Sequence, residues 1–162
     1  MSKYISLAGR LRESLVDLEK SVNRAVKLGK QAAKSGDDGY WDGVAFNLDS
    51  FYSGVERIFG DIALTVDGSI PEGTEWHRDL LYQVSAEVGG RPSVIARDTR
   101  RCLEELREFR LMVREKFAFN IRPSQLEALA RDLPECAELN PGRLPDKHLL
   151  CRSNPNPCPQ VI

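Results

Sequence analysis

The chain has 162 residues, 41% of them hydrophobic and 29% charged, and its net charge is −1. This length favours one globular domain with its own core, and the near-zero charge means that any basic site must be local. No apolar run reaches the roughly 18 residues needed to span a membrane. The opening segment, MSKYISLAGRLRESL, is too charged and periodic for a signal peptide. We therefore expect a cytoplasmic protein with no membrane partner.

The first two predicted helices are long and are joined by a short loop. Residues 4–34 and 40–66 both carry apolar side chains three and four positions apart, the pattern of packed amphipathic helices. The SGDDG segment between them breaks the pattern and favours a turn. We therefore expect an antiparallel helical hairpin. Three glycines in the second helix suggest close approach of a neighbouring helix: Gly43, Gly54 and Gly60.

Two further helices are predicted to follow a loop over residues 67–73. Thr74 is the expected cap of the third helix, and the segment GGRP at 89–92 is expected to end it. The fourth helix is predicted to start near Ser93 and to end near Asn120.

The fifth predicted helix starts at Pro123, because proline suits the first turn of a helix, and is limited by Pro134. No segment shows the alternation of a strand, so the predicted fold is an all-α antiparallel bundle of about five helices covering residues 1–139. Five of the nine prolines lie in residues 140–162. This tail has little apolar content and no periodicity, so we expect it to be disordered.

Four cysteines are too few to form a disulfide scaffold in a chain of this size. Cys102 shares the apolar phase of its helix and is expected to be a buried thiol. His148, Cys151 and Cys158 give the spacing His-x2-Cys-x6-Cys, a poor zinc pattern with only three ligands. We therefore expect neither a metal nor a cofactor.

The segment LREFRLMVREKFAFN places Arg107, Arg110 and Arg114 on one helix face, with apolar residues on the other side. Three guanidinium groups on one face could hold the phosphates of RNA. The alternative is a solvated face with salt bridges to nearby acidic residues: Glu104, Glu108 and Glu115. From the residues alone we favour the solvated face.

His77 is the only histidine in the predicted bundle, and imidazole titrates near neutral pH. It is therefore a candidate general acid or base. Because the sequence shows no partner for it, we expect a histidine that packs or lies on the helix surface.

The order of four segments resembles the HepT-like branch of the HEPN superfamily: AFNLDSFYSGVERIFGDIA, DGSIPEGTEWHRDLL, ELREFRLMVREKFAFNI and LARDLPEC. The resemblance covers about residues 1–139. It implies a helical bundle that forms a homodimer. It also implies that the protein is a toxin, paired with a nucleotidyltransferase that acts as the antitoxin. It also implies a metal-independent endoribonuclease, in which a motif arginine holds phosphate and a motif histidine moves a proton from the ribose 2′-hydroxyl. A tyrosine two residues beyond the histidine is implied to be the site where the partner attaches nucleotide.

Only part of this motif is present. Arg110 matches the motif arginine and is therefore the implied catalytic residue. The polar position that follows holds Leu111, the histidine position holds Glu115, and the tyrosine position holds Phe117. A carboxylate is ionised at neutral pH and repels phosphate, so it does not replace imidazole. The resemblance therefore implies a protein related to ribonucleases but impaired in catalysis, which needs another base, such as His77, if it cleaves RNA. The alternative is a non-catalytic dimeric module that binds a nucleotidyltransferase or RNA.

Overall fold

A computed structural model describes residues 2–115 and 121–138 of the chain. These residues form five α-helices and no β-strand, which confirms the all-α prediction. The helices are α1 (Lys3–Ser35), α2 (Gly39–Ile62), α3 (Trp76–Ser85), α4 (Arg97–Glu115) and α5 (Pro123–Cys136), and a π-helical turn, η1 (Ala63–Asp67), extends α2. Residues 140–162, with His148, Cys151 and Cys158, lie outside the described part, as does Phe117.

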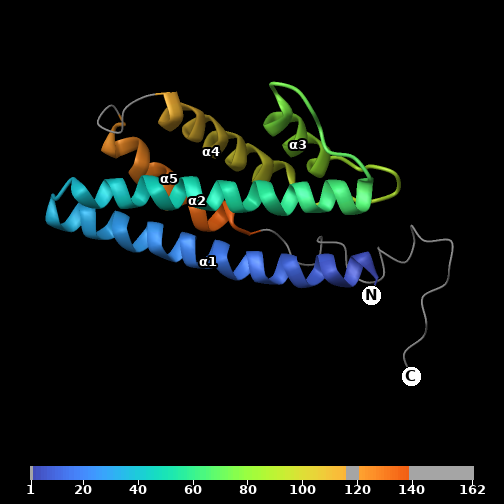
Figure 1. Ribbon diagram of the computed structural model, residues 1–162. Coiled ribbons are helices and arrows are strands. Elements are labelled where there is room, and N and C mark those ends of the chain that lie inside the picture. The colour runs from blue at the N-terminus through green and yellow to red at the C-terminus, as the bar shows by residue number, and fades with distance from the viewer. Residues whose placement is uncertain (1, 116–120, 139–162) are drawn as a thin grey trace.

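Helices α1 and α2 form the predicted antiparallel hairpin (Figure 1). Gly36 ends α1 in a left-handed conformation, with a φ of 71°, and its N–H donates to the Ala32 carbonyl at 3.0 Å. Glycine adopts this conformation without a Cβ penalty. Asp37 then accepts a hydrogen bond from the Gly39 N–H at 2.8 Å, which completes the tight connection.

Two glycines of α2 lie directly beneath leucines of α1. A Cβ atom at Gly54 would lie 2.6 Å from Leu18 Cδ2, and one at Gly43 would lie 2.8 Å from Leu28 Cδ1. Both distances are shorter than a normal carbon–carbon contact, so these glycines allow the two helices to approach. The predicted close approach of a helix is therefore confirmed at Gly43 and Gly54, and α1 is that helix. At Gly60 the prediction was wrong, because a Cβ atom there would lie 3.3 Å from Ile70 Cδ1 of the following loop.

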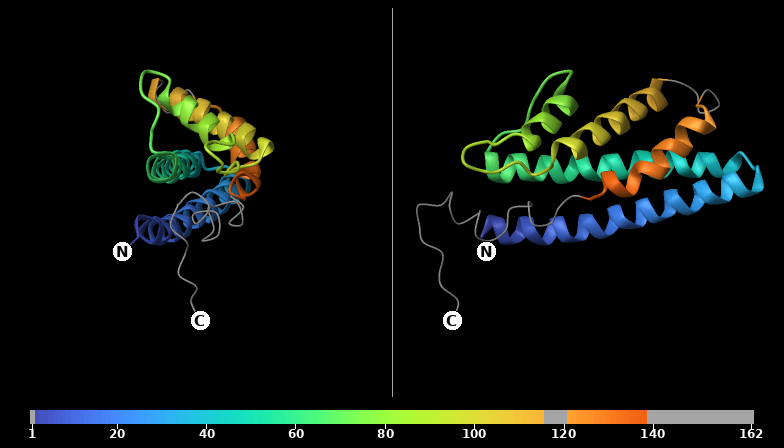
Figure 2. Two further views of the ribbon diagram at one scale, coloured as in Figure 1. Left: turned by 90° about the vertical axis from the view of Figure 1, so that its right-hand side faces the viewer. Right: turned by 180° about the vertical axis from the view of Figure 1, so that it is seen from behind.

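Helix α2 forms the middle of the bundle. Helices α3 and α4 cover its side opposite α1, and α5 crosses obliquely over α1 and α2 (Figures 1 and 2). Leu48, Phe51, Val55 and Ile58 of α2 are almost fully buried. Because of this central position, α3 and α4 both pack against α2.

The connection between α3 and α4 is longer than predicted. Helix α3 ends at Ser85 rather than near residue 89, and α4 starts at Arg97 rather than near Ser93. The intervening segment is not helical: it turns between Val88 and Arg91. It also buries Val94 and Ile95 in the core, and the Val94 N–H donates to the carbonyl of Val84 at 2.8 Å.

The start of α3 also differs from the prediction. Glu75, and not Thr74, is the residue at the N-cap of α3. The side chain of Glu75 makes no capping hydrogen bond. The next residue, Trp76, is therefore already helical.

A buried ion pair fixes the loops around α3. The Arg91 guanidinium donates to both carboxylate oxygens of Asp67, at 2.6 and 2.8 Å, and to the carbonyls of Gln83, Ala86 and Pro92. The side chains of Arg91 and Asp67 are 4% and 1% exposed. All three guanidinium nitrogens therefore have protein acceptors, and the network joins the end of η1 to the end of α3 and to the segment that follows it.

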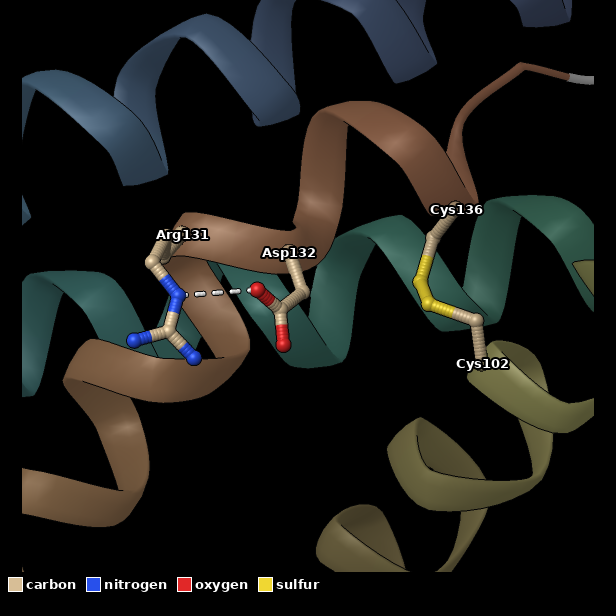
Figure 3. The surroundings of a disulfide bond; sticks show 4 residues. All are labelled: Cys102, Arg131, Asp132 and Cys136. Carbon is tan, nitrogen blue, oxygen red and sulfur yellow. Dashed lines mark hydrogen bonds and ion pairs between the residues drawn. A yellow bond between two sulfur atoms is a disulfide. The ribbon is translucent and has the colours of Figure 1, made fainter.

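A disulfide joins Cys102 of α4 to Cys136 at the end of α5 (Figure 3). The two Cα atoms lie 5.6 Å apart, a separation that suits a disulfide. The expectation that Cys102 is a buried thiol was therefore wrong, because the sequence does not show that the end of α5 lies next to α4 at this point. Helix α5 starts at Pro123, as predicted, and continues two residues beyond Pro134.

The helices of the described part include none that is long and apolar enough to cross a membrane.

The substitution Arg91→Met should lower the free energy of unfolding by about 3–5 kcal/mol, because it leaves the Asp67 carboxylate buried without its cation. Urea denaturation followed by circular dichroism measures this loss. The double variant Arg91→Met/Asp67→Asn removes both charges and should recover part of the stability. A loss below about 1 kcal/mol in the single variant would contradict a structural role for the pair.

Candidate functional site

A small pocket opens to solvent where α2, α3 and α4 meet. Its lining combines three arginines of α4 with a histidine and a tyrosine from the two neighbouring helices: Tyr52, His77, Arg107, Arg110, Leu111 and Arg114. The structure thus brings together all three predicted phosphate-binding arginines and the candidate acid or base, which come from segments about 30 residues apart in the sequence.

Glu56 of α2 links the two key side chains of this pocket. Its Oε1 accepts a hydrogen bond from Arg110 Nη1 at 3.1 Å, and its Oε2 lies 2.5 Å from His77 Nδ1. The side chains of Glu56 and Arg110 are each only 12% exposed. One half-buried carboxylate therefore positions both the motif arginine and the histidine.

Arg110 has further partners on α2. Its Nε lies 3.2 Å from Asp49 Oδ1, although the angle is unsuitable for a hydrogen bond, and its guanidinium lies 5.8 Å from the centre of the Tyr52 ring. The prediction of a solvated arginine face was therefore wrong for Arg110. The residue borders the core, and its ion-pair partners come from α2, which lies close by in the fold, rather than from its own helix.

Arg107 and Arg114 differ from Arg110 because they form no ion pair with any residue of the described part. Glu104, the expected partner of Arg107, instead pairs with Arg100 at 3.6 Å. Arg107 and Arg114 therefore bring positive charge to the pocket that the described carboxylates do not neutralise.

His77 is held from two sides. Its ring stacks on that of Trp76, with centroids 3.6 Å apart and an interplanar angle of 30°, and its Nδ1 contacts Glu56. Its side chain is 27% exposed, so it is neither buried nor free in solvent. His77 therefore packs against a neighbouring side chain, as expected, and Glu56 is a partner that the sequence does not show.

The acidic and aromatic residues that α2 contributes to this site were not predicted. Asp49, Tyr52 and Glu56 follow one another at intervals of three and four, so they lie on one helix face. That spacing was visible in the sequence as a polar stripe beside the apolar one. Its partner helix was not visible, because ion pairs between helices leave no local pattern.

Tyr52 is a buried phenol at the edge of the pocket. Burial raises the pKa of Tyr52 well above its ordinary value of 10.0, and the nearby Glu56 carboxylate raises it further. The phenol therefore stays neutral and can donate a hydrogen bond throughout the physiological pH range.

The remaining motif position lies at the end of α4. Glu115 is exposed and is the last residue of the helix in the described part. Within that part, no three His, Cys, Asp or Glu side chains gather in a way that could hold a metal ion.

Stability at alkaline pH provides a test of the Tyr52 environment. Because its pKa is raised only in the folded state, the unfolded chain ionises this phenol first, and the free energy of unfolding should fall as the pH rises above about 10. Tyr52→Phe removes this contribution, so the variant should lose less stability than the wild type between about pH 9 and pH 11. Urea denaturation across this range measures the difference, and equal losses would contradict the assigned environment.

Comparison with known proteins identifies the family of this chain. The family profile described as HepT-like protein matches residues 43–145, well over half of the chain and including all residues of the pocket. Searches of curated proteins and of solved structures found no significant match. The chain therefore belongs to the HepT-like proteins, a family of the HEPN type.

Proposed function

We propose that this HepT-like protein binds a phosphodiester of single-stranded RNA in the pocket between α2, α3 and α4. Membership of the family suggests a toxin-type or ribonuclease-related function. The observation that carries the proposal is the gathering of Arg107, Arg110 and Arg114 around one pocket. Guanidinium groups match phosphate oxygens in charge and geometry.

The three arginines have different roles in this proposal. Arg107 and Arg114 supply the charge that attracts the phosphate, because no described carboxylate pairs with them. Asp49 lies beside Nε of Arg110, and Glu56 accepts a hydrogen bond from Nη1. The third nitrogen, Nη2, forms no ion pair or hydrogen bond with a described residue. Arg110 is therefore a fixed, directional donor at the base of the site.

The chemistry of the motif is impaired in this proposal, because Glu115 stands at the histidine position and Phe117 at the tyrosine position. An exposed carboxylate at the end of α4 repels phosphate and cannot act as an imidazole. Phe117 also has no hydroxyl to which a partner could attach a nucleotide. Binding is thus the function that the motif residues themselves support.

The alternative function is that of a non-catalytic dimeric module that binds a nucleotidyltransferase antitoxin. The lost histidine and tyrosine positions favour it. A dimer that shows no measurable affinity for RNA in light scattering and binding assays would support this alternative over RNA binding.

Fluorescence anisotropy with a labelled 2′-O-methyl RNA tests RNA binding without interference from cleavage. Arg107→Ala and Arg114→Ala should each weaken binding and reduce the slope of log affinity against log salt by about 0.7, the value for one lost contact to a single strand. The control is Arg101→Ala, an exposed arginine on the opposite side of α4 from Arg110, which should bind as the wild type does.

Two outcomes would contradict the proposal. One is a wild-type protein with no measurable affinity for the RNA at low salt. The other is a loss of affinity in Arg101→Ala as large as that in the two pocket variants, which would indicate nonspecific attraction by the whole helix.

A further inference from the structure

The contact between His77 and Glu56 supplies what the motif lacks. His77 lies outside the motif segment, on α3, yet it lines the same pocket as the three arginines. Its Nδ1 faces a carboxylate oxygen of Glu56. We propose that His77, oriented by Glu56, is the acid–base catalyst of this site and that the protein cleaves RNA with it. This inference rests on the proposed binding of RNA in the pocket.

The carboxylate fixes which ring nitrogen is available. An ionised carboxylate can only accept hydrogen bonds, so the neutral imidazole carries its proton on Nδ1. Nε2 then keeps its lone pair and can accept a proton. The stack on Trp76 restricts rotation of the ring. These two contacts hold the imidazole in one tautomer and one orientation, as a general base requires.

Glu56 also links the catalyst to the motif arginine. One oxygen of its carboxylate, which is only 12% exposed, lies beside His77 Nδ1. Glu56 holds Arg110 through its other oxygen. The proton acceptor and the phosphate-facing guanidinium therefore keep a constant relative position, which favours reaction at one phosphodiester.

The reaction requires no co-reactant. His77 Nε2 removes the proton of the ribose 2′-hydroxyl, and the 2′-oxygen forms a bond to the adjacent phosphorus. The bond from phosphorus to the 5′-oxygen breaks, and the imidazolium returns its proton to that leaving oxygen. The products are a 2′,3′-cyclic phosphate and a 5′-hydroxyl, while Arg107, Arg110 and Arg114 stabilise the charge that develops on phosphate.

The test is cleavage of a labelled RNA by the full chain in EDTA. The wild type should give 2′,3′-cyclic phosphate ends. His77→Ala should reduce kcat by about 10²- to 10⁴-fold while leaving affinity for 2′-O-methyl RNA unchanged, and added imidazole should restore part of the rate. His148→Ala is the matched control, because His148 is the only other histidine of the chain. It should cleave as the wild type does.

Glu56→Gln tests the positioning role separately. It keeps the size of the side chain but removes its charge, so kcat should fall with little change in KM. Added imidazole should not restore this rate, because the ring of His77 is still present.

A second measurement covers the case in which His77→Ala does not fold. In the His148→Ala background, His77 is the only histidine, so diethylpyrocarbonate should abolish cleavage by the folded protein and hydroxylamine should restore it. Cleavage that survives either His77→Ala or this modification overturns the assignment of His77.

Binding and cleavage separate the two proposals. A wild type that binds RNA without cleaving it overturns this inference and leaves the proposed function intact. A wild type that does not bind RNA overturns both.

Discussion

The candidate site depends on the two contacts that the carboxylate of Glu56 makes. It lies on α2 and contacts Arg110 of α4 through one oxygen and His77 of α3 through the other. A half-buried carboxylate is costly unless it is paired and hydrogen-bonded, and here both oxygens have a partner. The same contacts that offset this cost bring a histidine and an arginine from separate helices into one pocket.

The rest of the fold holds these helices in place. Gly43 and Gly54 allow α1 to approach α2 closely, which leaves the opposite side of α2 for α3 and α4. Arg91 and Asp67 join the loops at the two ends of α3, and the disulfide between Cys102 and Cys136 joins α4 to α5. The site is therefore built on helices whose relative positions are set by packing, a buried ion pair and a covalent bond.

Helical periodicity was enough to predict the number of helices in the described part, their order and the hairpin of α1 and α2. It did not predict where α3 ends and α4 begins, because Val94 and Ile95 are buried by an irregular segment rather than by a helix. Arg110 and His77 were recognised as candidates from their residue types. Their shared partner Glu56 is 21 positions from His77 and 54 from Arg110, and only the tertiary structure brings it to them.

The most direct test of this account is the tautomer of His77 in the folded protein, measured by long-range ¹H–¹⁵N NMR and assigned with a His77→Gln variant. The account predicts that the neutral ring carries its proton on Nδ1 and that Nε2 is unprotonated. A ring that is mainly protonated on Nε2 would show that Glu56 does not hold the histidine, and it would contradict both the geometry of the site and the catalytic role built on it.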